Sequence, residues 1–254
     1  MNDNTTLKSF LNFIKNPDYL SSPKKVISKK FLILIKFYLL SILLLWIARG
    51  IDFVFINFKL YGTYNYKLIK YQSSIDSSSY SLLFVIILIS TPIFEEITFR
   101  LFLKKFNLTY FLISVSLLIG SSVYLVLKNN LWYPKISYAY AFMPLIYLII
   151  FFIPVLFLVY FIIKKIGDTK LETKWNSSFP ILFYVFSILF SIYHLPTLNL
   201  NLSHYLFLPI ILIPFFIYAI ILGFIRIRLG IGYAIILHYI YLIPTFISFL
   251  SEKI

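Results

Sequence analysis

Long apolar runs, separated by short polar and basic stretches, dominate the sequence. The runs are about 20 residues long, the length that an α-helix needs to cross the hydrocarbon core of a bilayer. No series of alternating ten-residue segments, as a membrane β-barrel requires, occurs along the chain. The pattern predicts an all-α fold, a polytopic transmembrane helix bundle of about seven membrane helices. We expect these helices at residues 31–48, 80–103, 108–127, 139–163, 179–195, 205–225 and 231–250.

Prolines and polar segments divide this pattern further. Pro154, Pro209 and Pro214 fall inside predicted helices, where we expect kinks. Residues 50–79 are amphipathic and then serine-rich, which predicts an interfacial helix or a loop. Residues 1–30 are polar and basic and lack a small-residue cleavage site after the apolar run, so we interpret them as a retained basic cytoplasmic tail.

The composition favours one membrane domain. Of all residues, 61% are hydrophobic and only 13% are charged, and nothing in the 254 residues marks a boundary between two folded domains. We therefore expect residues 31–254 to form a single transmembrane bundle. The chain contains no cysteine, which excludes disulfides, thiolate metal ligands and a cysteine nucleophile.

The net charge of +14 reflects topology rather than nucleic-acid binding, because the basic residues are dispersed at helix ends and not gathered on a soluble module. By the positive-inside rule, the predicted cell-membrane protein is multi-pass, with its N-terminus in the cytoplasm and its C-terminus outside. Some basic loops could instead only bind anionic headgroups of membrane lipids, without changing this topology. The more basic side carries Lys24, Lys25, Lys29, Lys30, Lys104, Lys105, Lys164, Lys165, Lys170, Lys174, Arg226 and Arg228, and the other side carries Arg49, Lys59, Lys67, Lys70, Lys128, Lys135 and Lys253.

Three charged residues, Glu95, Glu96 and Arg100, interrupt the apolar run at residues 81–103. Ionisable residues inside a membrane helix are costly and by default mark a functional site. Glu96 and Arg100 are four residues apart and can pair on one helix face, whereas Glu95 is offset by about 100° toward a partner helix. Burial disfavours an ionised carboxylate, and a glutamate tuned in this way suits a general base. The alternative is a structural ion pair with a spectator carboxylate.

The three histidines fall into two groups. His194 and His238 lie in late apolar helices, where a histidine is more often a hydrogen-bonded bundle residue than a catalytic one, although a nearby glutamate pair favours catalysis. His204 lies in a short polar connection, where we expect it to meet solvent or headgroups, and we assign it no role.

These residues carry a resemblance to a known family. Glu95, Glu96 and Arg100 match the motif E-E-x-x-x-R, Phe190 and His194 match F-x-x-x-H, and His238 stands where a third motif, H-x-x-x-N or D, begins. In this order they resemble the CAAX prenyl protease and bacteriocin-processing family of intramembrane endopeptidases (CPBP or Abi), which includes lysostaphin-resistance-A-like proteins. The resemblance covers residues from about 80 to 250.

The resemblance implies hydrolysis of a peptide bond in a membrane-associated peptide or protein substrate. In this mechanism Glu95 activates the water, Glu96 is held by Arg100, and His194 with His238 orients the water and stabilises the tetrahedral intermediate. No cofactor is needed. The alternative is a zinc site with Glu95, His194 and His238 as ligands and an open fourth position. We favour the metal-free mechanism, because the glutamates do not form the H-E-x-x-H arrangement of zinc proteases.

Two features depart from the family pattern. Leu242 stands where the pattern has asparagine or aspartate, so a polar group proposed to help hold the oxyanion is missing, and Tyr239 and Tyr241 are nearby donors that could replace it. Two extra helices also intervene within residues 108–163, an even number that preserves the orientation of the helix bearing His194.

Three alternatives follow for function. The chain is an active protease, a catalytically inactive membrane immunity or scaffold protein of the same family, or, less in keeping with the pattern, a proton-coupled transporter. The abundance of Ile, Lys, Asn, Phe and Tyr suggests an AT-rich genome and a low-GC bacterium. Peptide maturation, bacteriocin self-immunity and signalling-peptide processing are therefore the candidate roles rather than prenyl processing.

Overall fold

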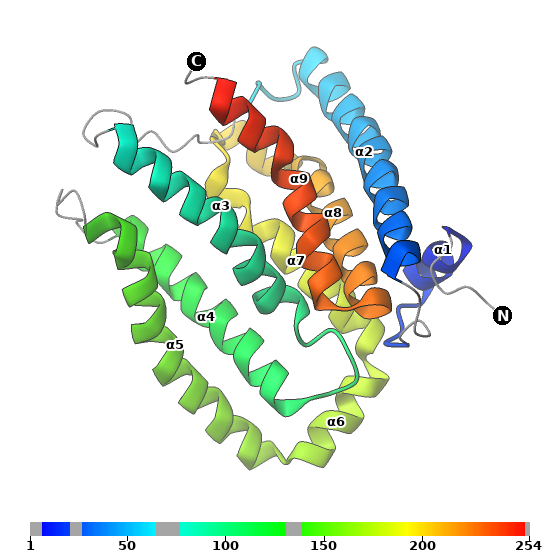
Figure 1. The fold of residues 1–254 in the computed structure, drawn as a ribbon, viewed down its shortest axis with the longest axis vertical. Coiled ribbons are helices and arrows are strands. Elements are labelled where there is room, and N and C mark those ends of the chain that lie inside the picture. Colours follow the sequence, from blue (N-terminus) through cyan, green and yellow to red (C-terminus); the bar gives the residue numbers. More distant parts are fainter. Residues whose placement is uncertain (1–6, 21–26, 65–76, 131–138, 252–254) are drawn as a thin grey trace. The chain divides into compact units, whose positions relative to one another are not determined.

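The computed structural model describes residues 7–20, 27–64, 77–130 and 139–251, and in these ranges it is helical without a strand (Figure 1). The chain divides into two compact units. The first, unit 1, comprises residues 1–70 and 179–254, and the second, unit 2, comprises residues 71–178. The α-helices are α1 (Leu7–Lys15), α2 (Ile27–Asn57), α3 (Ser77–Arg100), α4 (Leu108–Asn130), α5 (Ala139–Ile166), α6 (Asp168–Ser177), α7 (Phe179–Tyr193), α8 (Leu208–Leu229) and α9 (Ile231–Ser251), with 3-10 helices η1 (Leu195–Thr197) and η2 (Leu202–Phe207).

Helix α8 is the centre of unit 1. It contacts α1, α2, α7, α9 and η2. Its sequence is apolar on all sides, as expected of a helix surrounded by others, and from Ile221 to Arg228 every side chain is buried. Pro209 lies in the first turn of α8, where a missing backbone N–H costs nothing, so the predicted kink at this proline is wrong.

Unit 2 is built from α3, α4, α5 and α6. Helix α4 packs on both α3 and α5, and Gly120 faces the backbone of α5 at Phe152. At Gly167, whose φ is +92°, the chain turns by 91° from α5 into α6. Trp175 then anchors α6, since its indole N–H donates to the Lys104 carbonyl at 3.2 Å.

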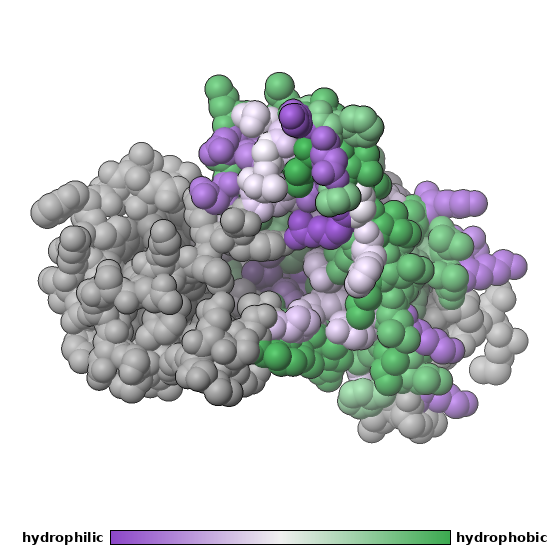
Figure 2. All heavy atoms as spheres, turned by 90° about the horizontal axis from the view of Figure 1, so that it is seen from above, coloured by the Kyte–Doolittle hydropathy of each residue, from purple (hydrophilic) through white to green (hydrophobic). Residues whose placement is uncertain are grey.

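Three helical segments in the described residues are long and apolar enough to cross a membrane, namely residues 29–57, 179–197 and 202–229, and the bent pair α5 and α6 raises the number to four. The apolar parts of α4 (Leu108–Val123) and α9 (Ile231–Pro244) are shorter. The all-α membrane class is therefore supported, and the count of seven spans stays a prediction. Seen from above, apolar residues cover much of the described surface (Figure 2).

All seven predicted helices occur as helices, but their ends differ. Helix α2 runs nine residues beyond its predicted end at residue 48, through Arg49 and Asp52, which pair with each other at 3.5 Å. The predicted interfacial segment therefore begins as a continuation of α2, within a candidate membrane span, and residues 65–76 of it lie outside the described residues. Helices α1 and α6 were not predicted, because each is short and has few buried side chains, Phe10 and Phe13 in α1 and Trp175 in α6.

Candidate functional site

The charged triplet lies in the last two turns of α3. The guanidinium of Arg100 donates to the Glu96 carboxylate at 2.5 Å, and the two side chains are 2% and 0% exposed. The predicted pairing one turn apart is therefore confirmed. A charge-assisted hydrogen bond of this kind compensates two charges in a low-dielectric setting.

Glu95 is also buried, at 5% exposure, on a different face of the same turn. The backbone around it is fixed by α4, because the hydroxyl of Ser114 donates to the Ile97 carbonyl at 2.7 Å. Near the triplet in the chain, Phe99, Phe102 and Leu103 are buried. The side chain of Glu95 thus extends from a helix turn that α4 contacts, and it is largely shielded from solvent.

His194 lies just beyond α7 and not on it, which corrects the prediction that the helix continues through this residue. Pro196 follows in η1, where the helix cannot continue. The Nδ1 of His194 lies 2.9 Å from the Phe190 carbonyl, and because a carbonyl only accepts, Nδ1 donates. In the tautomer with its single proton on Nδ1, Nε2 is an acceptor.

Phe190 contacts both motif histidines, His194 and His238, in unit 1. Its ring centroid lies 4.5 Å from that of His194 and 6.4 Å from that of His238 on α9. On its other side, His194 stacks on Phe215 at 4.7 Å. His238 is 7% exposed. The residues of the second and third motifs therefore surround one aromatic ring inside unit 1.

Tyr241 follows His238 by three residues on α9 and points into unit 1. Its ring lies 4.4 Å from that of Tyr218 on α8 and 5.8 Å from that of Tyr38 on α2. Its hydroxyl oxygen is buried. Leu242, the position at which the family pattern has a polar residue, is half-buried. Tyr241, one of the two donors suggested by the sequence, is thus placed among aromatic rings of unit 1.

The structure gathers the glutamates and Arg100 in unit 2 and the two histidines in unit 1. The convergence of Glu95, His194 and His238 on one site stays a prediction. Within each unit, the described residues hold no group of three His, Asp or Glu side chains placed to bind a metal ion. The zinc alternative stays a prediction as well.

His204 is fully buried, so the prediction that it meets solvent or headgroups is wrong. Its Nδ1 accepts a hydrogen bond from the Asn201 N–H at 2.8 Å, and its Nε2 lies 2.8 Å from the Gly62 carbonyl. One acceptor and one donor nitrogen define a neutral imidazole with the proton on Nε2. The polar connection is thus folded against the end of α2, with the His204 ring 5.7 Å from that of Tyr61.

Asp52 is the centre of a polar cluster that was not predicted from the sequence. It accepts hydrogen bonds from the hydroxyls of Tyr61 at 2.5 Å and Tyr64 at 3.0 Å. Burial, together with the hydrogen bond and charge of Asp52, raises the pKa of Tyr61 above its usual value, so this hydroxyl remains protonated. An acidic residue inside the apolar run of α2 is the same signal that revealed Glu95, and it could have revealed Asp52.

A second missed ion pair joins the N-terminal segment to α8. Arg228 donates to both carboxylate oxygens of Asp18, at 2.6 and 3.0 Å, and also to the Leu20 carbonyl. Burial acts to raise the pKa of Asp18, but the hydrogen bonds from Arg228 and the Leu20 N–H, with the Arg228 charge, outweigh it and hold that pKa below its usual value. The predicted basic tail is therefore fixed to unit 1 at this point.

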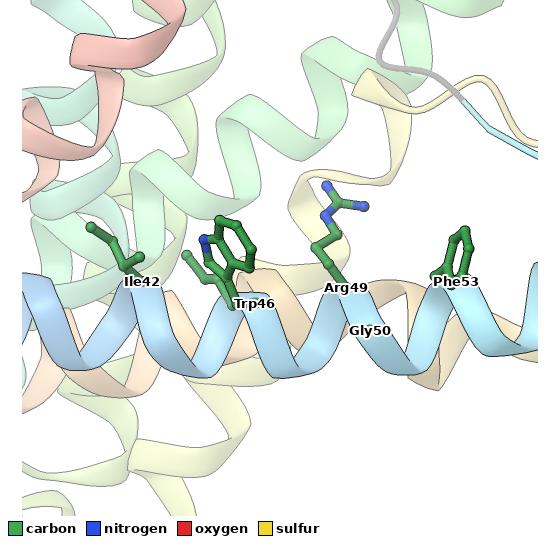
Figure 3. Close-up of a pocket in the computed structure, with 6 residues that line it drawn as sticks. Ile42, Trp46, Arg49, Gly50 and Phe53 are labelled. Atoms are coloured by element: carbon green, nitrogen blue, oxygen red, sulfur yellow. The ribbon is translucent and has the colours of Figure 1, made fainter.

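The groove along α2 is separate from these residues. It is lined only by Ile42, Leu45, Trp46, Arg49, Gly50 and Phe53, which lie along one side of the helix (Figure 3). Trp46 is 77% exposed. An open groove on a single apolar helix is an exposed surface rather than an enclosed reaction chamber.

Comparisons of the chain with protein families, with characterised proteins and with solved structures find no significant match. The family resemblance therefore rests on the motif residues alone.

Proposed function

We propose that the chain is an intramembrane endopeptidase similar to the CAAX protease and bacteriocin-processing family. In this proposal it crosses a bacterial cell membrane seven times, with its N-terminus in the cytoplasm, and cleaves a membrane-associated peptide or protein. The single observation that carries the proposal is the buried triplet on α3, where Glu96 is neutralised by Arg100 at 2.5 Å and Glu95 is a second carboxylate buried one residue away. Ionisable side chains inside an apolar helix are destabilising, and their presence there is typical of a functional site.

Glu95 is the general base of the proposed reaction. Its carboxylate takes a proton from water while the water oxygen forms a bond to the scissile carbonyl carbon, and the carbonyl π electrons move onto the oxygen. When the tetrahedral intermediate collapses, the C–N bond breaks and Glu95 returns the proton to the leaving amine. Glu96 has a different role in this proposal, because its carboxylate is paired with the Arg100 guanidinium.

The two histidines then take different roles. Because Nδ1 of His194 donates to the Phe190 carbonyl, its Nε2 is an acceptor and can orient the attacking water. His238, whose ring also lies beside that of Phe190, is the donor for the developing oxyanion. In the zinc alternative, Nε2 of His194 would be a metal ligand, and its Nδ1 bond to a carbonyl is the usual orientation of such ligands. Zinc would then polarise the carbonyl and acidify the water.

The proposal is tested by comparing peptide termini in cells that express the wild type, Glu95→Gln or Glu172→Gln. Glu172 lies on the polar helix α6, so Glu172→Gln is a matched control for the loss of one carboxylate. We expect new termini in membrane-associated proteins with the wild type and Glu172→Gln, and their absence with Glu95→Gln. Equal termini with all three variants would refute the catalytic role of Glu95.

A catalytically inactive immunity or scaffold protein is the second candidate, and Leu242 is the residue that favours it. If this candidate is correct, a protective phenotype against an antimicrobial peptide persists in Glu95→Gln and no termini change. Protection that disappears together with the termini would instead favour the protease.

A further inference from the structure

Helix α1 has three distinct faces. Phe10 and Phe13 are 3% and 1% exposed, whereas Leu7 and Leu11 are 55% and 52% exposed. The third face is polar and exposed, and it consists of Lys8, Asn12 and Lys15. At 100° per residue, the apolar side chains form an arc of about 160°, of which the protein covers only the part around the two phenylalanines. The uncovered leucines lie directly beside the lysines.

The buried face fixes the depth of α1 along the membrane helices of unit 1. Phe13 contacts Phe183 at 4.9 Å and Phe224 at 5.2 Å, measured between ring centroids. Phe183 and Phe224 lie four and five residues from the ends of their candidate spans, 179–197 and 202–229. At 1.5 Å per residue this is about 6 to 8 Å inside those ends. That depth is where the acyl chains meet the lipid headgroups.

The segment that follows α1 holds the helix at this level. The hydroxyl of Tyr184 on α7 donates to the Ile14 carbonyl, and Arg228 on α8 binds both Asp18 and the Leu20 carbonyl. Leu20 itself is 61% exposed. Helix α1, which lies beside the N-terminal part of α2 (Figure 1), is therefore attached to the bundle at both its buried face and its C-terminal end.

The charge of this region suits an anionic partner. Residues 1–30 contain Lys8, Lys15, Lys24, Lys25, Lys29 and Lys30 but only two acidic residues, Asp3 and Asp18. Asp18 is neutralised by Arg228, which leaves the lysines in excess. Lysines beside exposed leucines on an amphipathic helix are typical of helices that lie in the membrane interface and prefer anionic lipids.

We propose that α1 lies in the plane of the membrane interface and binds anionic phospholipid. Leu7 and Leu11 insert at the boundary of the acyl chains, and Lys8 and Lys15 contact the lipid phosphates. This inference concerns unit 1 alone and does not depend on the proposed protease activity.

The chain has no cysteine, so single cysteines can be labelled cleanly in the full-length protein. An environment-sensitive fluorophore is attached at Leu11→Cys or, as the matched control on the next residue, at Asn12→Cys, and each protein is reconstituted in vesicles of phosphatidylcholine with or without phosphatidylglycerol. We expect the label at residue 11 to be quenched by lipids with a nitroxide near the top of the acyl chain. The label at residue 12 should be quenched by aqueous iodide instead.

The lysines are tested by energy transfer from the label at residue 11 to fluorescent phosphatidylglycerol, compared with fluorescent phosphatidylcholine. Lys8→Gln and Lys15→Gln should each lower the preference for phosphatidylglycerol, by about fivefold per lysine. The proposal is overturned if residue 11 is quenched by iodide as strongly as residue 12. It is equally overturned if residue 11 is shielded from both quenchers, which would indicate a protein partner, or if the lipid preference survives both substitutions.

Discussion

At the scale of single residues, Glu96 and Arg100 form the most buried charge pair in the described part of α3. Each side chain is compensated by the other in a setting where an isolated charge is costly. The pair therefore occupies one carboxylate of the diglutamate, and in our proposal Glu95 is the carboxylate that exchanges a proton with water. Asp52 and Arg228 follow the same rule, since each is a buried charged side chain with hydrogen-bond partners of its own.

Removing Arg100 should be far more damaging than removing an exposed cation. Arg100→Gln leaves the Glu96 carboxylate buried without its counter-charge, and we expect a loss of about 3–5 kcal/mol in the free energy of unfolding. Thermal unfolding in detergent measures the effect, with exposed Lys170→Gln as the control. The double variant Glu96→Gln/Arg100→Gln should recover part of the loss. If Arg100→Gln is as stable as Lys170→Gln, Arg100 does not compensate the buried charge of Glu96, and the account of this pair is wrong.

The Asp18–Arg228 pair predicts a loss of stability in acid. Because the pKa of Asp18 is lowered in the folded state, its contribution is complete above the usual value of 3.8 and is lost as the pH falls through the folded-state value. The wild type should therefore lose more stability than Asp18→Asn between about pH 5 and about pH 2, a range that includes the usual pKa of an aspartate. Parallel pH profiles for the two proteins would contradict the prediction.

At the scale of elements, the length of the apolar runs predicted the long helices. It did not predict where these helices end, nor the short helices α1 and α6. The runs that become α2 to α5 and α7 to α9 are long enough to be read directly. Helix α1 could not be predicted from apolar length, because it is short. Its phenylalanines are buried by contacts with residues such as Phe183 and Phe224, which lie over 160 residues away in the chain. Likewise, the extension of α2 depends on Tyr61 and Tyr64, which satisfy Asp52 from beyond the end of the helix.

The bend between α5 and α6 depends on one backbone conformation. Gly167 has a φ of +92°, which a residue with a Cβ adopts only with strain, so Gly167→Ala should cost about 1–3 kcal/mol of stability. Gly50→Ala is the matched control, because Gly50 lies inside α2 and a Cβ there meets no atom within 4 Å. That substitution should stabilise the protein by about 0.5–1 kcal/mol. Equal thermal shifts of the two variants would contradict this account.

At the scale of the whole molecule, the sequence motifs placed chemistry on particular helices but could not place the helices themselves. Glu96 and Arg100 could be paired from their spacing because both lie on one helix, and the structure confirms the pair. The sharing of Phe190 by His194 and His238 could not be read from the sequence, since it joins the end of α7 to α9. His204 was misjudged because its partners, Gly62 and Tyr61, are distant in the chain.

The number of membrane crossings is open to a direct test. If α2 and α3 both cross the membrane, Lys59→Cys lies outside the cell and Lys105→Cys lies in the cytoplasm. A membrane-impermeant maleimide should label the first in intact cells and the second only after permeabilisation. Labelling of both from the same side would show that α3 is not a span, and it would remove the orientation on which the proposed site depends.

The central claim is that Glu95 activates water for peptide hydrolysis, and the most direct measurement is cleavage in ¹⁸O-labelled water. Purified wild type, reconstituted with a substrate identified from its cellular termini, should release a product whose new carboxylate carries one ¹⁸O atom. Glu95→Gln should slow this release by at least about 10²-fold, the usual contribution of a general base, while Glu172→Gln should not. Release at the wild-type rate by Glu95→Gln, or a product without ¹⁸O, would contradict the claim.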